Sequence, residues 1–228
     1  MVYRQANRDP IFENRFDAGK QLAEKLSAYK NEATIVLAIP NGGLPIGLQV
    51  ALALGAELDV VISRKIPIPL RPEGGFGAVA DDGTIILNHD LVRDLKLTPS
   101  QINYQVAGVR NEIQKRSIFY RGTRPLSVVT GKTVIIVDDG LASGYTMMAA
   151  VESVRRRRPA RIIVAVPVAS ELAVRKVEKV ADRIVTVETA LVPKFYVSYY
   201  YRFWNTVSDD EGLKCLKEWE MRRFKTRG

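Results

Sequence analysis

The sequence predicts an α/β fold in which a parallel β-sheet core is flanked by helices. Short apolar runs alternate with longer segments of helical periodicity, the order expected for parallel strands joined by helical crossovers. Residues 134–137 are four β-branched residues in succession, a pattern typical of a strand buried on both faces. Because the chain has 228 residues, of which 46% are apolar, it can bury a sizeable core, and we expect a single domain over residues 1–228.

The first part of this core is predicted between about residues 12 and 65. Apolar spacing, capping residues and turn residues define its elements. In order, they are a helix capped by Asn14, a strand at 34–39, a turn at 40–43, a helix that begins near Pro45 and stops at Gly55, and a strand at 58–63 that ends in Arg64 and Lys65.

Residues 66–125 are predicted to form an insertion between two core strands. The first segment, residues 66–73, is rich in proline, so we expect it to be irregular. An Asp-Gly pair predicts a hairpin over residues 78–88. Thr98 opens a capping box with proline at the first helical position, which predicts a long helix. An excursion of this length is more than a connection requires, and such insertions are often lids.

The core is predicted to resume over residues 126–187. Its elements are the strand at 134–137, a helix that stops at Pro159, a strand at 161–167, a helix capped by Ser170, and a strand at 183–187. Residues 188–228 are then predicted to contain an aromatic segment and a C-terminal helix, which a capping box at Ser208 opens. The aromatic segment, residues 195–204, has seven of the chain's aromatic residues and occupies the place of the C-terminal hood in the family that the chain resembles below. Such a density predicts a packed cap or a stacking surface.

Composition narrows the classes of function. No apolar run is long enough to span a bilayer, and the first residues lack the apolar core of a signal peptide. The single cysteine, Cys215, excludes an internal disulfide, so we expect a cytoplasmic protein. With one histidine, His89, and one cysteine, neither a zinc site nor a Cys-His nucleophile is expected. The net charge of +9 indicates an anionic partner, either a nucleic acid or a phosphate-rich substrate.

The segment that follows the 134–137 strand carries the chemistry. Asp138 and Asp139 stand where ligands bind in open parallel sheets, at the carboxyl end of a strand. Two carboxylates about 5 Å apart repel by roughly 3 kcal/mol at an effective dielectric near 20, so a cation or hydroxyl donors would relieve them. Glycines and hydroxyl residues lead from them into a helix, where backbone amides can bind an anion. Together these features suggest a sugar phosphate as ligand.

Residues 134–146 (VIIVDDGLASGYT) resemble the phosphoribosyl-pyrophosphate motif of the type I phosphoribosyltransferases. That motif consists of four apolar residues, two acids and a short loop that ends in small-Thr/Ser-Gly-x-Thr. The turn at residues 40–43 resembles the pyrophosphate loop of that family, and Arg64 and Lys65 resemble the basic end of its second core strand. In detail, residues from about 12 to 211 look closest to the predicted phosphoribosyltransferases of unassigned acceptor.

The resemblance implies a role for each residue of these motifs. Asp138 and Asp139 would be the catalytic acids, binding the ribose hydroxyls and Mg²⁺ directly or through water. The residues implied for the 5-phosphate are Gly140, Leu141, Ala142, Ser143, Gly144, Tyr145 and Thr146. The residues implied for the pyrophosphate are Asn41, Gly42, Gly43, Arg64 and Lys65.

The function implied is transfer of ribose 5-phosphate from Mg-phosphoribosyl pyrophosphate to a nitrogen acceptor, with a nucleobase as the first guess. The resemblance also suggests a homodimer. Two positions depart from family patterns. Ala142 stands where hypoxanthine-guanine enzymes have an acid, although adenine-type enzymes also have alanine there, and Asn41 stands where a basic residue is usual. We expect no membrane partner.

Alternatives remain open. The acid pair also occurs in response-regulator receivers and haloacid-dehalogenase-like enzymes, but the following loop fits neither. The arginine run at residues 155–158 suggests either a solvated helix end or a contact with nucleic acid or another subunit. The rival hypothesis is therefore a non-catalytic regulator that senses phosphoribosyl pyrophosphate and binds nucleic acid. A third option is hydrolysis of phosphoribosyl pyrophosphate without an acceptor.

Overall fold

A computed structural model describes residues 9–30 and 32–225. Its helices are α1 (Arg15–Lys25), α2 (Gly43–Leu54), α3 (His89–Asp94), α4 (Pro99–Arg121), α5 (Tyr145–Arg155), α6 (Glu171–Val177) and α7 (Asp209–Lys225), with short 3-10 helices at Ser27–Tyr29 and Val197–Tyr200. Its strands are β1 (Thr34–Ala38), β2 (Glu57–Val60), β3 (Ser63–Ile68), β4 (Arg71–Ala80), β5 (Ile85–Leu87), β6 (Thr133–Val137), β7 (Arg161–Ser170) and β8 (Arg183–Ala190).

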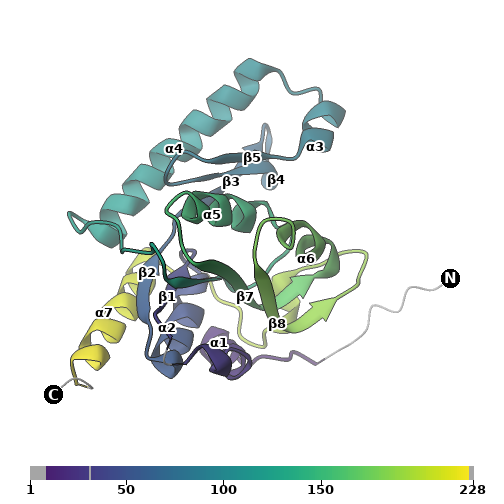
Figure 1. Cartoon of the computed structure of the whole chain (residues 1–228). Helices are drawn as coiled ribbons and strands as arrows, with labels where there is room; N and C mark the ends of the chain where they lie inside the picture. Colours follow the sequence, from purple (N-terminus) through teal and green to yellow (C-terminus); the bar gives the residue numbers. More distant parts are fainter. Residues whose placement is uncertain (1–8, 31, 226–228) are drawn as a thin grey trace.

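Five of these strands form the predicted parallel core sheet, in the order β2-β1-β6-β7-β8. Strand β6 lies at its centre, and Ala38 of β1 pairs in register with Val137 of β6. Helices α1, α2 and α7 contribute to one apolar layer, whereas α5 and α6 cover the other face (Figure 1). The α/β class predicted from the alternating pattern is therefore confirmed.

The remaining strands form a second, antiparallel sheet in the order β3-β4-β5. This sheet packs on α5, and the long helix α4 crosses its other side (Figure 1). The hairpin and the long helix predicted for the insertion are both present, and the Thr98 capping box forms as expected.

Two predictions for residues 58–73, where the core meets the insertion, were wrong. The second core strand does not continue to Ser63 and end in Arg64 and Lys65, because β2 ends at Val60 and Ser63 begins the second sheet. Residues 66–73 are not irregular, because β3 and β4 extend into them. Pro67 is accommodated at a shift in the β3–β4 register, where its missing N–H is tolerated.

Capping residues set the helix ends near the site as the sequence predicted. Asn14 accepts hydrogen bonds from two amides of the first turn of α1, and Ser170 caps α6. Gly55 ends α2 in the left-handed region, with φ of 66°. Among the described helices, none combines the length and the apolar character that crossing a lipid bilayer requires.

Candidate active site

The acid pair lies directly after β6, beside the turn that follows β1. Because β1 and β6 are neighbouring parallel strands, their carboxyl ends bring Gly42 and Gly43 against Asp138 and Asp139. A Cβ on Gly42 would lie 2.0 Å from Oδ2 of Asp139, and one on Gly43 would lie 2.7 Å from the carbonyl oxygen of Val137. Only glycine permits this approach, so the turn and the acids form one site.

Asp139 is held by groups from both ends of the chain. Nε of Arg15 lies 2.8 Å from its Oδ2, and the two side chains are only 9% and 17% exposed. The hydroxyl of Tyr201 donates to its backbone carbonyl oxygen at 2.6 Å. Its own amide donates to Oδ1 of Asp138 at 2.8 Å. Asp138 takes part in no ion pair among the described residues.

Sequence reasoning missed Arg15, although one signal marked it. Arg15 is the first residue of α1, where the helix dipole disfavours a positive charge. A buried cation at that position needs a compensating partner, and Asp139 supplies it from 124 residues away. The position therefore marks Arg15 as unusual, but the sequence does not identify its partner.

Electrostatics leave Asp138 poorly compensated. Burial raises the pKa of Asp138 well above its usual value, and the charge of Asp139 raises it further. Burial also raises the pKa of Asp139, against the opposing effect of Arg15. One arginine thus faces two carboxyl groups, so the site is one positive charge short when both are ionised. It therefore favours a cation or hydroxyl donors.

The loop after the acids is fastened to the neighbouring strand on one side. The amide of Leu141 donates to the carbonyl of Val168, and the amide of Ser170 donates to the carbonyl of Leu141, both at 2.9 Å. The hydroxyl of Ser170 donates to the carbonyl of Ala142 at 2.7 Å. These bonds hold the loop in a defined shape without using the amides that follow.

The other side of the loop presents unpaired donors at the N-terminus of α5. Gly144 has φ of 87°, a conformation that glycine adopts without strain, and it turns the chain into the helix. Among the described residues of this loop, the amides of Ala142, Ser143, Gly144, Tyr145 and Thr146 donate to no protein acceptor. A loop of free amides at a helix N-terminus is suited to binding phosphate.

Two further contacts border this loop. The Nζ of Lys176 lies 3.4 Å from the carbonyl oxygen of Ser143 and 4.6 Å from the ring centre of Tyr145. Burial lowers the pKa of Lys176. The aromatic segment packs against the start of the loop, because a Cβ on Gly140 would lie 2.5 Å from Val197. Val197 of the aromatic segment therefore lies against the start of the loop, and the role of the segment as a hood stays a prediction.

Asn41 uses its side chain to join three elements. Its amide nitrogen donates to the carbonyl of Val207 at 2.8 Å and to Asp209 at 2.9 Å. Its oxygen accepts from Arg116 and from the hydroxyl of Tyr120. The peptide bond between Pro40 and Asn41 is cis. Asn41 thus links the turn to α4 and α7, and both polar atoms of its side chain are engaged within the protein.

The two predicted pyrophosphate cations lie in the second sheet. Arg64 forms an ion pair with Glu112 of α4 at 3.0 Å, and Nζ of Lys65 donates to the carbonyl of Glu73 at 2.6 Å. Within the described chain, neither makes a hydrogen bond or ion pair with the aspartates. The hydroxyl of Ser63 donates to the carbonyl of Thr146 at 2.9 Å. This bond joins the start of β3 to the first turn of α5, directly after the loop of free amides.

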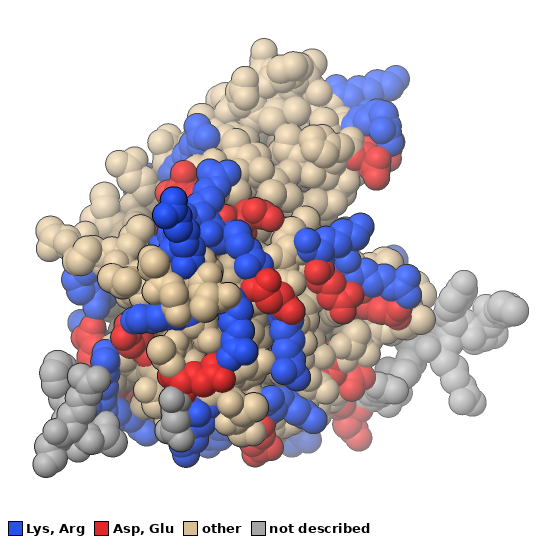
Figure 2. Space-filling view, in the orientation of Figure 1, with Lys and Arg blue, Asp and Glu red and all other residues tan. Residues whose placement is uncertain are grey.

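The arginine run at the end of α5 is engaged with the protein. Arg155 pairs with Asp182 at 2.9 Å, Arg156 lies 3.7 Å from Asp82, and Arg157 donates to the carbonyl of Ser127. Figure 2 shows that basic side chains on one face of the molecule are interspersed with acidic ones. The run therefore has a structural use, which weakens its case as a nucleic-acid contact.

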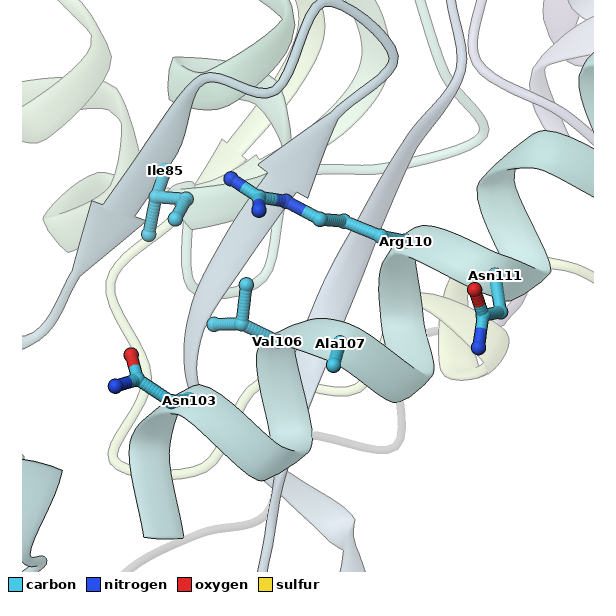
Figure 3. Close-up of a pocket in the computed structure, with 6 residues that line it drawn as sticks. All are labelled: Ile85, Asn103, Val106, Ala107, Arg110 and Asn111. Carbon is cyan, nitrogen blue, oxygen red and sulfur yellow. The ribbon is translucent and has the colours of Figure 1, made fainter. Parts of the chain in front are cut away.

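A hollow of about 350 Å³ lies elsewhere, between β5 and α4 (Figure 3). Its lining residues are Ile85, Asn103, Val106, Ala107, Arg110 and Asn111. It contains no carboxylate and no glycine loop, so it lacks the groups that distinguish the site at β6.

Comparison with known proteins agrees with this geometry. Residues 78–204 match the family model described as "Phosphoribosyl transferase domain". A Mycobacterium tuberculosis (strain H37Rv) protein named "Putative phosphoribosyl transferase Rv0571c" is 36% identical over 206 residues, which are 90% of this chain and 46% of that protein. The chain thus spans about half the length of the curated relatives it matches.

Solved structures show the same fold. The crystal structure of TT1426 from Thermus thermophilus is 37% identical and has a TM-score of 0.74, with 91% of this chain and 98% of that chain covered. The structure of AQ2163 from Aquifex aeolicus is 12% identical and has a TM-score of 0.51, with 82% of this chain and 84% of that chain covered. At this identity the match shows a likeness of fold alone. The matched family model covers more than half of the sequence, and the chain belongs to the phosphoribosyl transferase domain family.

Proposed function

We propose that this protein is a phosphoribosyltransferase that uses Mg-phosphoribosyl pyrophosphate, transfers ribose 5-phosphate to a nitrogen acceptor, first of all a nucleobase, and releases pyrophosphate. One observation carries the proposal: an undercompensated acid pair stands beside a loop of free amides at a helix N-terminus. Hydroxyl groups and a phosphate on one small ligand match these two features, and membership of the family supports a phosphoribosyl compound as that ligand.

The chain's own residues suggest how the ligand would be held. Asp138 would accept hydrogen bonds from the ribose hydroxyls, since it lacks a cationic protein partner. The free loop amides, with the hydroxyls of Ser143 and Thr146, would bind the 5-phosphate. The backbone of Asn41 and Gly42 would bind the pyrophosphate, while the missing Cβ of Gly42 leaves room for the Asp139 carboxylate beside the turn.

The donor set fits Mg²⁺ only with help from the ligand. Among the described residues, no group of three or more metal-binding side chains is preassembled. Mg²⁺ commonly binds through one or two carboxylates together with water and substrate phosphates. Asp138 is the carboxylate best placed to hold such an ion, directly or through water, with Asp139 beside it. When bound, the ion would neutralise charge on the leaving pyrophosphate.

Arg64 and Lys65 can join this site only by rearrangement. Arg64 pairs with Glu112, and Lys65 donates to the carbonyl of Glu73. Water can replace both of these contacts, because the side chains of Glu112 and Lys65 are solvent-exposed. We propose that the start of the insertion reorients toward the pyrophosphate when the substrate binds. Ser63 would then act as the fixed point, because it is bonded to the carbonyl of Thr146.

The test is a pyrophosphate-release assay with Mg²⁺, phosphoribosyl pyrophosphate and a panel of bases, including a control without base. We expect release with at least one base. The variant Asp138→Asn should weaken productive binding by roughly ten- to hundred-fold, since a hydrogen bond to a charged group contributes about 1.5–3 kcal/mol. Release without any base would favour hydrolysis, and no release with any base would contradict the transferase.

The regulator remains the second candidate because of the net charge of +9. A salt-dependent complex with RNA or DNA, combined with phosphoribosyl pyrophosphate binding but no pyrophosphate release, would favour it. The contacts that Arg155, Arg156 and Arg157 make within the protein argue for the transferase instead.

A further inference from the structure

We propose that Arg15 is a positioning residue, which holds the Asp139 carboxylate against the aromatic segment and leaves Asp138 as the carboxylate of the pair that binds the ligand. The identity of that ligand rests on the proposed function, but the positioning role does not. The proposal therefore gives the two acids different roles, Asp139 as the partner of Arg15 and Asp138 as the ligand-binding carboxylate, whereas the motif alone treats them as equivalent.

The first support is the surroundings of Asp139. Its Oδ2 receives the Nε of Arg15 at 2.8 Å, and it also faces Gly42, where a Cβ would lie only 2.0 Å away. The same oxygen is thus covered from two directions by protein. Asp138 has no comparable polar partner, since its Oδ1 accepts only the amide of Asp139 and no cation pairs with it in the described chain.

The second support is the way in which Arg15 uses the rest of its side chain. Its Nη1 donates to the carbonyl oxygen of Asn205 at 2.7 Å. Its guanidinium carbon lies 3.8 Å from the ring centre of Trp204 and 5.9 Å from that of Tyr201. A planar guanidinium can stack and form directional hydrogen bonds at the same time, whereas a lysine ammonium cannot. Arg15 therefore joins the acid to the aromatic segment.

The third support is that the backbone holds Arg15 in place. The amide of Phe12 donates to the carbonyl of Tyr200 at 2.9 Å, and the amide of Arg202 donates back to Phe12 at 2.8 Å. The rings of Phe12 and Tyr201 lie 5.2 Å apart. The chain before α1 thus runs beside the aromatic segment, and the two deliver Arg15 and Tyr201 to the same aspartate.

The consequence is a mechanical link between the hood and the acid pair. A displacement of the aromatic segment would remove the stacking partner of Arg15 and the Tyr201 hydrogen bond to Asp139 together. Arg15 would keep its direct ion pair with Asp139 but lose the contact that fixes the orientation of its guanidinium.

The first experiment needs no ligand. The chain has two tryptophans, so Trp219→Phe leaves Trp204 as the reporter of the Arg15 contact. In that background, Arg15→Met should increase acrylamide quenching of Trp204 at least two-fold, and Arg15→Lys should do so partly. The matched control is Arg202→Met, which removes an exposed pair with Glu13 nearby. Equal quenching in the Arg15→Met and control proteins, with folding verified by circular dichroism, would overturn the positioning role.

The second experiment measures Mg-phosphoribosyl pyrophosphate binding by calorimetry. Asp138→Asn should raise Kd at least ten-fold, whereas Asp139→Asn, which keeps an oxygen for Arg15, should raise it less than three-fold. Equal losses, or the reverse order, would overturn the division of labour. If the unmodified protein does not bind this compound, the proposed function and the ligand-binding half of the inference fail, while the quenching result still decides the positioning role.

Discussion

In two regions of this molecule a buried arginine lies close to two aspartates, and the two regions differ in how many of their polar groups have protein partners. At the site, Arg15 faces Asp138 and Asp139. At the base of the insertion, Arg121 lies 3.0 Å from Asp81 and 3.9 Å from Asp59, and it also donates to the carbonyl of Val60. Both arginines are less than a tenth exposed.

The difference lies in what remains unmatched. Around Arg121, each carboxylate has a protein partner, since Asp59 also accepts the hydroxyl of Ser127 at 2.6 Å. Around Arg15, Asp138 has no cation and the adjoining loop has free amides. Acidic pairs and buried arginines therefore do not identify a binding site by themselves. Nε of Arg121 is itself buried without a hydrogen-bond partner, so a single unsatisfied atom does not identify a site either. What distinguishes the site at β6 is an unpaired carboxylate beside several free loop amides, because one ligand can satisfy these groups together.

The largest effect is expected on protein stability when Arg121 is replaced. If this cluster is purely structural, Arg121→Met should lower the free energy of unfolding by about 3–5 kcal/mol, because it strands two buried carboxylates. Urea unfolding followed by circular dichroism measures the loss. Arg124→Met removes an exposed pair with Glu220 and should cost less than about 1 kcal/mol. Similar losses in both variants would show that burial gives the Arg121 cluster no special weight.

Gly42→Ala tests the site cluster by crowding it. The new methyl group would lie 2.0 Å from Oδ2 and 2.6 Å from Cγ of Asp139, so the carboxylate has to move. We expect pyrophosphate release to fall by about a hundred-fold, the scale of effect that an error of about 1 Å in positioning can cause. Steady-state kinetics with a folded variant give the measurement, and retained kcat/KM would contradict the close approach.

Asp138→Asn probes the missing positive charge through its dependence on pH. The folded-state pKa of Asp138 is raised, so its protonated form stabilises the wild type below the unfolded pKa of about 3.9, and that stability is lost as pH rises through the folded value. The variant should therefore have a higher Tm than the wild type at pH 8. The difference should vanish near pH 4. A variant that is less stable at pH 8 would show that Asp138 is well compensated.

Gly108→Ala should have the smallest effect of these variants, and it should raise the free energy of unfolding where the others lower stability or activity. Gly108 lies within α4, and a Cβ there would meet nothing within 4 Å. Alanine favours the helix over glycine by about 0.5–1 kcal/mol, so the variant should be slightly more stable with unchanged pyrophosphate release. A loss of stability would mean that the insertion needs this glycine for packing. Together with Gly42→Ala, it separates a glycine needed at the site from one that is not.

The sequence predicted the groups that are close together along the chain. Asp138 and Asp139, the loop after them and the α/β order follow local patterns, so the acid pair and its loop were placed correctly beside each other. The contacts of Arg15 with Asp139 and of Arg121 with Asp81 join residues 124 and 40 positions apart. No local pattern encodes such a contact, because it depends on how separate elements pack.

Arg64 and Lys65 illustrate a different limit. The apolar run at residues 58–63 predicts one strand, but residues 58–60 lie in β2 of the core sheet and Ser63 begins β3 of the second sheet. Hydrophobicity is the same for a strand buried in either sheet, and the hydrogen-bond partners that distinguish them lie far along the chain. The pyrophosphate role of these two residues stays a prediction.

The contact between Gly140 and Val197 has a consequence for how this family can vary. The two positions share one volume, since a methyl group at 140 would fall 2.5 Å from Val197. Substitution at either position alone is therefore constrained by the other. Homologous chains that carry a side chain at 140 should show compensation at 197, by a smaller residue or by a shortened segment, and the two sites should covary.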